Sequence, residues 1–205
     1  MAMRLLILLF LLLASGASTA AETRVLVIGD SLSAAYDMPT EQGWVALLDE
    51  RLGERAEVIN AAISGDTSAS ARARLPRALD AHAPDVVIIA VGGNDGLRGI
   101  PLAALRGNLT AMIDQARAAG ARVLLAGVRL PTNYGPAFID RFLATFQQVA
   151  DATGVAFVPR ILEGVAGDPA LMLDDGIHPN ADAQPIILDN IWQALAPMLA
   201  TQHAG

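Results

Sequence analysis

The sequence predicts an α/β fold in which helices cover both faces of a five-stranded parallel sheet. Three observations predict it. Five short apolar runs alternate with five helical patterns, residues 85–91 are apolar on both faces as in a central parallel strand, and no linker or repeat divides the chain after residue 21. Right-handed crossovers then place helices on both sides of the sheet, giving a three-layer α/β/α sandwich. The simplest strand order is 2-1-3-4-5, with a topological switch point between the first and third strands.

The first half of the chain supplies three strands and two helices. Residues 24–28 are an apolar run and predict the first strand. Residues 43–52 carry a stripe of leucines and one tryptophan on one helical face. Residues 57–61 form the second expected strand, and residues 67–81 form a helix with two leucines facing inward. Residues 85–91 are the third, central strand.

The second half continues the alternation. Residues 101–119 open with a proline and end before a glycine, as helices often do. Residues 122–128 are the fourth strand. Residues 137–153 form a helix that the following glycine ends, and residues 155–158 are the fifth strand. The last helix, residues 182–199, is bent or started at Pro185.

Residues 1–20 have the layout of a signal peptide. A short basic start precedes an apolar block from Leu5 to Ala14 and a small, polar stretch that ends at Ala20. A membrane anchor is the alternative, but the apolar block is only about half of the roughly 20 residues that a spanning helix needs. We therefore expect an exported protein, periplasmic or secreted, with one domain over residues 21–205.

Charge and composition exclude several functions. The chain carries 21 acidic and 14 basic residues, for a net charge of −7. An acidic surface repels phosphate backbones and anionic headgroups, so we expect no nucleic-acid partner and no stable membrane insertion. The chain contains no cysteine, which excludes disulfides, thiol catalysis and thiolate metal sites.

A serine stands where the first strand ends, in the string Gly29-Asp30-Ser31. Ligands of open α/β sheets bind outside the carboxyl ends of the strands, so Ser31 is placed to act as a nucleophile. Near the end of the chain, His178 can take its proton, and Asp175 can orient the imidazole. A turn at Gly176 would bring these two side chains to one side.

Two further loops emerge at the same edge of a parallel sheet. The second strand leads into Ser64-Gly65-Asp66, and the third leads into Gly92-Gly93-Asn94. The backbone N–H groups of Ser31 and Gly65 and the side-chain amide of Asn94 are the expected donors to an oxyanion.

These residues also admit plainer interpretations. Asn94 after two glycines fits a simple turn, and Asp66-Thr67 fits a helix N-cap. Asp174, Asp175 and His178 could ligate a metal, but one histidine and two carboxylates make a poor site. We expect no metal and no cofactor.

In their order along the chain, the blocks around Ser31, Gly65, Asn94 and His178 resemble those of the SGNH hydrolases, also called GDSL esterases or lipases. Within that family, the chain is similar to bacterial acyl-CoA thioesterases, lysophospholipases and arylesterases. The resemblance implies a flavodoxin-like SGNH hydrolase fold without a cofactor. It also implies a serine esterase of lipid metabolism that hydrolyses aryl esters, acyl-CoA and lysophospholipids through an acyl-serine intermediate. Asp175 matches the family's D-x-x-H position.

The resemblance extends to the binding surface for the acyl chain. Residues 96–100 are similar to the loop that lines the acyl pocket in the relatives. The expected substrate-binding residues are Leu97, Ile100, Pro131, Tyr134 and Ile177. One departure is Ala35, which stands where the family usually has glycine and whose methyl group is expected to crowd the floor of the site.

Two other functions compete with this one. A carbohydrate O-deacetylase would use the same fold, but it handles polar substrates, whereas the loops here are apolar. An exported binding protein would have kept the pocket and lost catalysis, although no catalytic position is missing. We expect a monomer whose partner is a small-molecule ester or thioester with an acyl chain.

Overall fold

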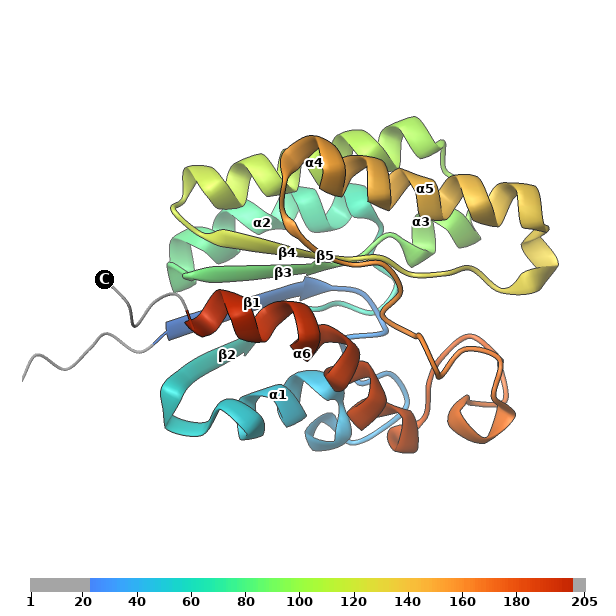
Figure 1. Cartoon of the computed structure of the whole chain (residues 1–205), viewed down its shortest axis with the longest axis horizontal. Coiled ribbons are helices and arrows are strands. Elements are labelled where there is room, and N and C mark those ends of the chain that lie inside the picture. Colours follow the sequence, from blue (N-terminus) through green and yellow to red (C-terminus); the bar gives the residue numbers. More distant parts are fainter. Residues whose placement is uncertain (1–22, 201–205) are drawn as a thin grey trace, which may run out of the picture.

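The five strands form one parallel sheet in the order β2-β1-β3-β4-β5, which confirms the predicted topology (Figure 1). The computed structural model describes residues 23–200, so the predicted signal peptide, residues 1–20, lies outside the described residues. β1 lies between β2 and β3, with Val27 opposite Asn60 on one side and Ile88 on the other. The strands are β1 (Thr23–Gly29), β2 (Ala56–Asn60), β3 (Val86–Ala90), β4 (Arg122–Ala126) and β5 (Ala156–Val158).

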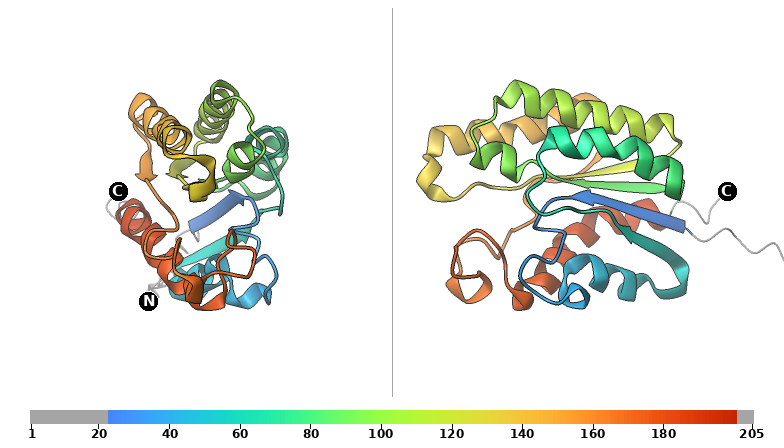
Figure 2. Two further views of the ribbon diagram at one scale, coloured as in Figure 1. Left: turned by 90° about the vertical axis from the view of Figure 1, so that its right-hand side faces the viewer. Right: turned by 180° about the vertical axis from the view of Figure 1, so that it is seen from behind.

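Helices cover both faces of the sheet, as predicted. On one face, α4 (Leu102–Ala118) lies between α2 (Ser68–His82) and α5 (Pro136–Thr153) and contacts both. On the other face, α1 (Trp44–Leu52) contacts α6 (Gln184–Ala200). The end view in Figure 2 shows the sheet between these two layers. The strands of such a sheet are covered on both sides, which is why β3 is buried along its whole length.

The observed element ends differ from the predicted ones by one or two residues, with one larger difference. The short helix α3 (Gly93–Leu97) occupies a stretch expected to be a loop. Five residues that include two glycines carry no helical period, so the pattern could not predict it. Its position is fixed by the buried carboxylate of Asp95, which accepts hydrogen bonds from the backbone N–H and hydroxyl of Ser68. The last helix begins at Gln184, so Pro185 starts it and does not bend it.

Trp44 connects the loop after β1 to the helices beneath the sheet. Its side chain is fully buried, and its indole Nε1 donates a hydrogen bond to the carbonyl of Leu32 at 3.1 Å. Its backbone N–H donates to Oε1 of the buried Gln184 at 3.0 Å. Helices α1 and α6 therefore both hold the loop that carries Ser31. Within residues 23–200, no helix has the length and apolarity needed to span a bilayer.

Candidate active site

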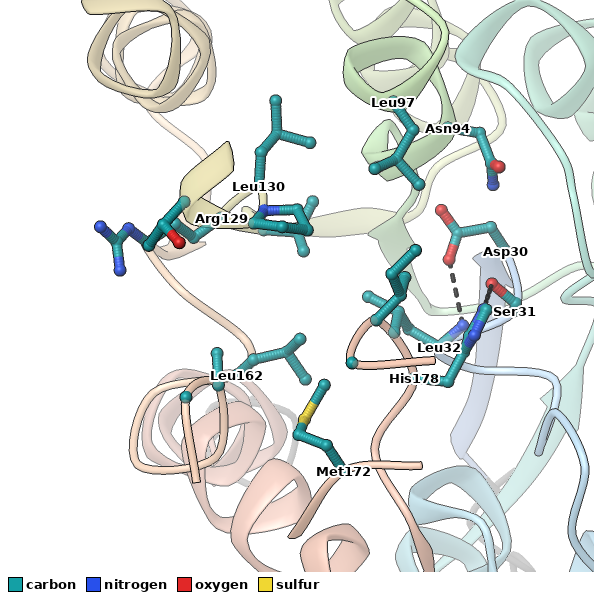
Figure 3. Close-up of a pocket in the computed structure, with 18 residues that line it drawn as sticks. Asp30, Ser31, Leu32, Asn94, Leu97, Arg129, Leu130, Leu162, Met172 and His178 are labelled. Atoms are coloured by element: carbon teal, nitrogen blue, oxygen red, sulfur yellow. Dashed lines mark hydrogen bonds between the residues drawn. The ribbon is translucent and has the colours of Figure 1, made fainter. Parts of the chain in front are cut away.

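Ser31, His178 and Asp175 lie in hydrogen-bond contact although 147 positions separate the serine from the histidine. Nε2 of His178 is 2.9 Å from Oγ of Ser31 (Figure 3). Nδ1 of His178 is 2.6 Å from Oδ2 of Asp175. A carboxylate beside Nδ1 favours the tautomer that carries its proton there. Nε2 is then free to accept the proton of the serine hydroxyl.

Asp175 is held in its ionised form by the turn that it belongs to. Its Oδ1 accepts hydrogen bonds from the backbone N–H groups of Ile177 at 2.8 Å and His178 at 2.9 Å. Burial alone would raise the pKa of Asp175. Hydrogen bonds from the backbone and ring of His178 and from the backbone of Ile177 outweigh that effect and lower this pKa below its ordinary value. Gly176 has a φ of +64°, which suits the glycine of the predicted turn.

The loop after β1 is built around Asp30, which is almost fully buried. Its Oδ1 accepts the backbone N–H of Leu32 at 3.1 Å (Figure 3). Its backbone carbonyl accepts the N–H groups of Ser33 and Ala34. Burial raises the pKa of Asp30 to about 6, against smaller lowering effects from the Leu32 N–H and from nearby His178. These contacts turn the chain sharply and present Ser31 at the sheet edge.

Asn94 lies beside Ser31 and His178 in the lining of one cavity. Its Nδ2 donates to the carbonyl of Asp66 at 3.0 Å, which orients the amide and leaves its second N–H available. Gly65, next to Asp66, does not line the cavity; its φ is +83°, and its carbonyl accepts a hydrogen bond from Arg98 at 2.9 Å.

Arg74 of α2 holds the loops after β1 and β2 together. Its Nη2 donates to the carbonyl of Gly29 at 3.1 Å, and its Nε pairs with the carboxylate of Asp66 at 2.6 Å. A further guanidinium N–H donates to the carbonyl of Ala61. Thr67 caps α2, which supports the N-cap interpretation of this segment, whereas Asp66 forms an ion pair with Arg74.

A mostly apolar cavity of about 260 Å³ opens next to Ser31 and His178. Leu97, Pro131 and Ile177, three of the residues expected to bind substrate, line it. Ile100 and Tyr134, also expected to bind substrate, do not line it. The hydroxyl of Tyr134 instead donates to the carbonyl of Leu97 at 3.0 Å, which supports the cavity wall from outside.

The sequence does not single out several residues that line the cavity. Leu130 adjoins Pro131 at the carboxyl edge of β4, so its place at the sheet edge could have identified it. Leu162 and Met172 come from the irregular segment between β5 and α6, where no periodic pattern identifies inward positions. Figure 3 shows Leu97, Leu130, Leu162 and Met172 around the cavity.

Ala35 does not line the apolar cavity, but it lines a smaller space beside Ser31 and His178. Its methyl group lies 2.9 Å from the place where a Cβ on Gly43 would stand. Its φ of +54° explains why glycine would fit this position with less strain.

The aromatic ring of Tyr36 covers one face of the His178 imidazole. The ring centroids are 4.1 Å apart, and the planes are inclined by 26°. Within residues 23–200, no group of three or more acidic or histidine side chains is arranged to hold a metal ion.

The chain matches the model of the GDSL-like lipase/acylhydrolase family over residues 27–185. It is 51% identical to the esterase TesA of Pseudomonas aeruginosa, over 88% of this chain and 91% of that protein. It is 44% identical to an arylesterase of Vibrio mimicus, over 96% and 99% of the two chains. It is 42% identical to thioesterase 1/protease 1/lysophospholipase L1 of Escherichia coli K12, over 93% and 91%. A crystal structure of TesA superposes with a TM-score of 0.84 at 51% identity and covers 85% of this chain and 99% of that one.

Proposed function

Because the chain belongs to the GDSL-like lipase/acylhydrolase family and is a serine esterase, we propose that Ser31, His178 and Asp175 carry out its reaction. The observation that supports this most directly is the unbroken contact from Asp175 through His178 to Ser31 at the mouth of an apolar cavity. This arrangement joins a nucleophile, a base and a group that orients the base.

In the first half of the proposed reaction, Oγ of Ser31 attacks the carbonyl carbon of the ester while Nε2 of His178 takes the hydroxyl proton. The negative oxygen that forms is met by the backbone N–H groups of Ser31 and Gly65 and by the amide of Asn94. The bond to the leaving group then breaks, and His178 gives its proton to the departing oxygen or sulfur. The product of this half is an acyl-Ser31 ester and a free alcohol or thiol.

Water completes the cycle by the same steps in the same site. His178 takes a proton from the water, whose oxygen attacks the acyl carbonyl. The bond to Oγ of Ser31 breaks, and the proton returns to the serine. The released product is a carboxylic acid.

We infer that the substrates are small esters and thioesters with an apolar acyl chain, such as aryl esters, acyl-CoA and lysophospholipids. The cavity supports an acyl chain because Leu130, Leu162 and Met172 offer no hydrogen bonds of the kind that a sugar needs. A rate profile over p-nitrophenyl esters from acetyl to palmitoyl, with acetylated xylan alongside, tests this. Faster hydrolysis of the polysaccharide than of every acyl ester would contradict it.

Replacing Ser31 with alanine tests the assignment of the nucleophile. We expect Ser31→Ala to lose hydrolysis of p-nitrophenyl butyrate and covalent labelling by a fluorophosphonate, while Ser70→Ala, on an exposed serine of α2, retains both. Wild-type turnover by Ser31→Ala would end the proposal.

The export of this esterase is also a proposal, which rests on the pattern of residues 1–20. Expression of the full chain in a Gram-negative host should yield a mature periplasmic or secreted form that begins near residue 21, as a monomer with one domain over residues 21–205. Fractionation with N-terminal sequencing and light scattering checks these points. An uncleaved cytoplasmic product would contradict the export.

A further inference from the structure

Two large apolar side chains are prominently exposed within residues 23–200, and one of them, Tyr36, lies beside Ser31 and His178. Tyr36 is 42% exposed and Ile63 is 51% exposed. Tyr36 follows β1 and Ile63 follows β2, so both lie in loops at the carboxyl edge of the sheet. Exposed apolar side chains that gather beside a reactive centre point to a ligand contact.

The backbone around Tyr36 takes a conformation that few residues adopt. Ala35 and Asp37, on either side of it, each have a φ of +54°. Ala83, which ends α2, is the other non-glycine residue with a positive φ in the described part of the chain. Two unfavourable φ values on either side of one residue indicate that the loop holds that side chain in a position needed for function. Here they hold the ring of Tyr36 against His178.

Hydrogen bonds tie Ile63 to the same edge. Its backbone N–H donates to the carbonyl of Gly29 at 3.0 Å, and its carbonyl accepts the N–H of Asp66 at 3.1 Å. A further bond, from Nδ2 of Asn60 to the carbonyl of Ser33 at 2.9 Å, joins the end of β2 to the loop after β1. The loops that carry Tyr36 and Ile63 are therefore each bound to the end of the neighbouring strand.

The acyl cavity lies on the opposite side of Ser31. Its apolar walls come largely from segments that follow β3, β4 and β5, and neither Tyr36 nor Ile63 lines it. Because β1 separates β2 from β3 in the sheet, Ser31 stands between the cavity and the loop that carries Ile63. An ester whose acyl chain fills the cavity must extend its alcohol portion away from it, past Nε2 of His178.

We propose that Tyr36 and Ile63 form a leaving-group subsite that accepts flat, apolar alcohol portions such as phenols. The subsite rests on the proposed function, because it requires attack by Ser31 and protonation of the leaving group by His178. An aromatic leaving group can rest against the exposed part of the Tyr36 ring and the side chain of Ile63. Aromatic pairs of this kind correspond to rate or affinity changes of about 10-fold.

Esters that share one acyl group and differ in the alcohol test the subsite. We expect Tyr36→Ala to lower kcat/KM for phenyl butyrate about 10-fold more than for methyl butyrate, relative to wild type. Ile63→Ala should act in the same direction to a smaller extent, and Tyr36→Phe should behave as wild type. Tyr134 is the only other tyrosine, and its hydroxyl supports the wall of the acyl cavity. As a control, Tyr134→Ala should lower the rates with both esters by the same factor.

Two measurements separate failure of the subsite from failure of the proposed function. Deacylation uses no leaving group, so Tyr36→Ala should deacylate at the wild-type rate in single-turnover experiments. Equal losses with both esters and in deacylation would show that Tyr36 only positions His178, which would overturn the subsite. If Ser31→Ala kept full activity, the proposed function itself would fail.

Discussion

Asp175 contacts His178 at two points. Its Oδ2 lies 2.6 Å from the ring Nδ1, and its Oδ1 accepts the backbone N–H of the same residue at 2.9 Å. A single carboxylate therefore fixes both the direction of the imidazole and the loop that carries it. The lowered pKa of Asp175 keeps this carboxylate ionised throughout the range in which an imidazole acts as a base.

Replacing Asp175 with asparagine should lower kcat by up to about 10⁴-fold with little change in the fold. An amide can donate to Nδ1, which would place the ring proton on Nε2 and prevent it from accepting the proton of Ser31. Steady-state rates on p-nitrophenyl butyrate check this, with Asp174→Asn as the matched control at the exposed neighbouring acid. If Asp175→Asn and Asp174→Asn had the same rates, the orienting role would be wrong.

Asp30 should make the stability of the fold depend on pH. Its pKa rises from 3.8 to about 6 on folding because the carboxyl is buried, so the folded state binds its proton more tightly than the unfolded chain does. The resulting stabilisation is present below about pH 4, and about 3 kcal/mol of it is lost as the pH rises through about 6.

Urea unfolding of the wild type and Asp30→Asn at pH 4, 6 and 8 isolates this contribution. Titrating groups that do not interact with Asp30 are common to both proteins and cancel in the difference. The asparagine variant should gain stability relative to wild type by about 2 kcal/mol between pH 4 and pH 8. A difference that does not vary with pH would show that Asp30 is ionised in the fold as readily as in the unfolded chain.

Asn94→Ala should lower kcat by about 10² to 10³-fold and leave KM nearly unchanged, because the amide is proposed to bind the oxyanion more strongly than the ground-state carbonyl. Kinetics with p-nitrophenyl butyrate provide both constants. A rise in KM at constant kcat would instead assign Asn94 to ordinary substrate binding.

Leu97→Ala should reduce the preference for octanoyl over acetyl esters about 10-fold, because it removes apolar surface from the acyl cavity. Ile100→Ala is the matched control, since Ile100 is an aliphatic residue of the same segment that does not line the cavity. The ratio of kcat/KM for the two p-nitrophenyl esters is the measurement. Equal effects of the two substitutions would argue that the acyl chain lies elsewhere.

Ala35 and Gly43 should show coupled effects on stability. A methyl group on Gly43 would stand 2.9 Å from the Ala35 Cβ, so Gly43→Ala should cost about 1 to 3 kcal/mol by overpacking. In the background of Ala35→Gly, where that methyl is absent, the cost should shrink by about 1 kcal/mol or more. Urea unfolding of the four proteins gives the coupling. Additive effects would place the strain at another contact.

The sequence pattern predicts those parts of the fold that have long, regular periodicity, namely the strands and the long helices. Apolar runs separated by amphipathic helices gave the strand order, and the order placed Ser31, Gly65 and Asn94 in loops at one sheet edge. His178 could be added because its loop is marked by Gly176 and the following proline.

The remaining parts of the site depend on contacts between segments without periodicity. Helix α3 owes its position to Asp95 and Ser68, and no pattern indicates that these two side chains meet. Ile100 and Tyr134 lie in the expected segments but do not line the cavity, because no periodic pattern in a loop indicates which side chains face inward. The sequence does not indicate Tyr36, because its stacking on His178 joins residues that lie far apart along the chain.

The guanidinium of Arg74 shares its N–H groups among Gly29, Ala61 and Asp66. A lysine could not replace it, because an ammonium lacks the planar fork that reaches several acceptors at once. The loop after β1, which carries Ser31, and the loop after β2 therefore cannot unfold separately while α2 stays folded. Loss of turnover and unfolding of the whole domain should therefore occur at the same temperature on heating. We expect no intermediate in which the domain stays folded while the active site is disrupted.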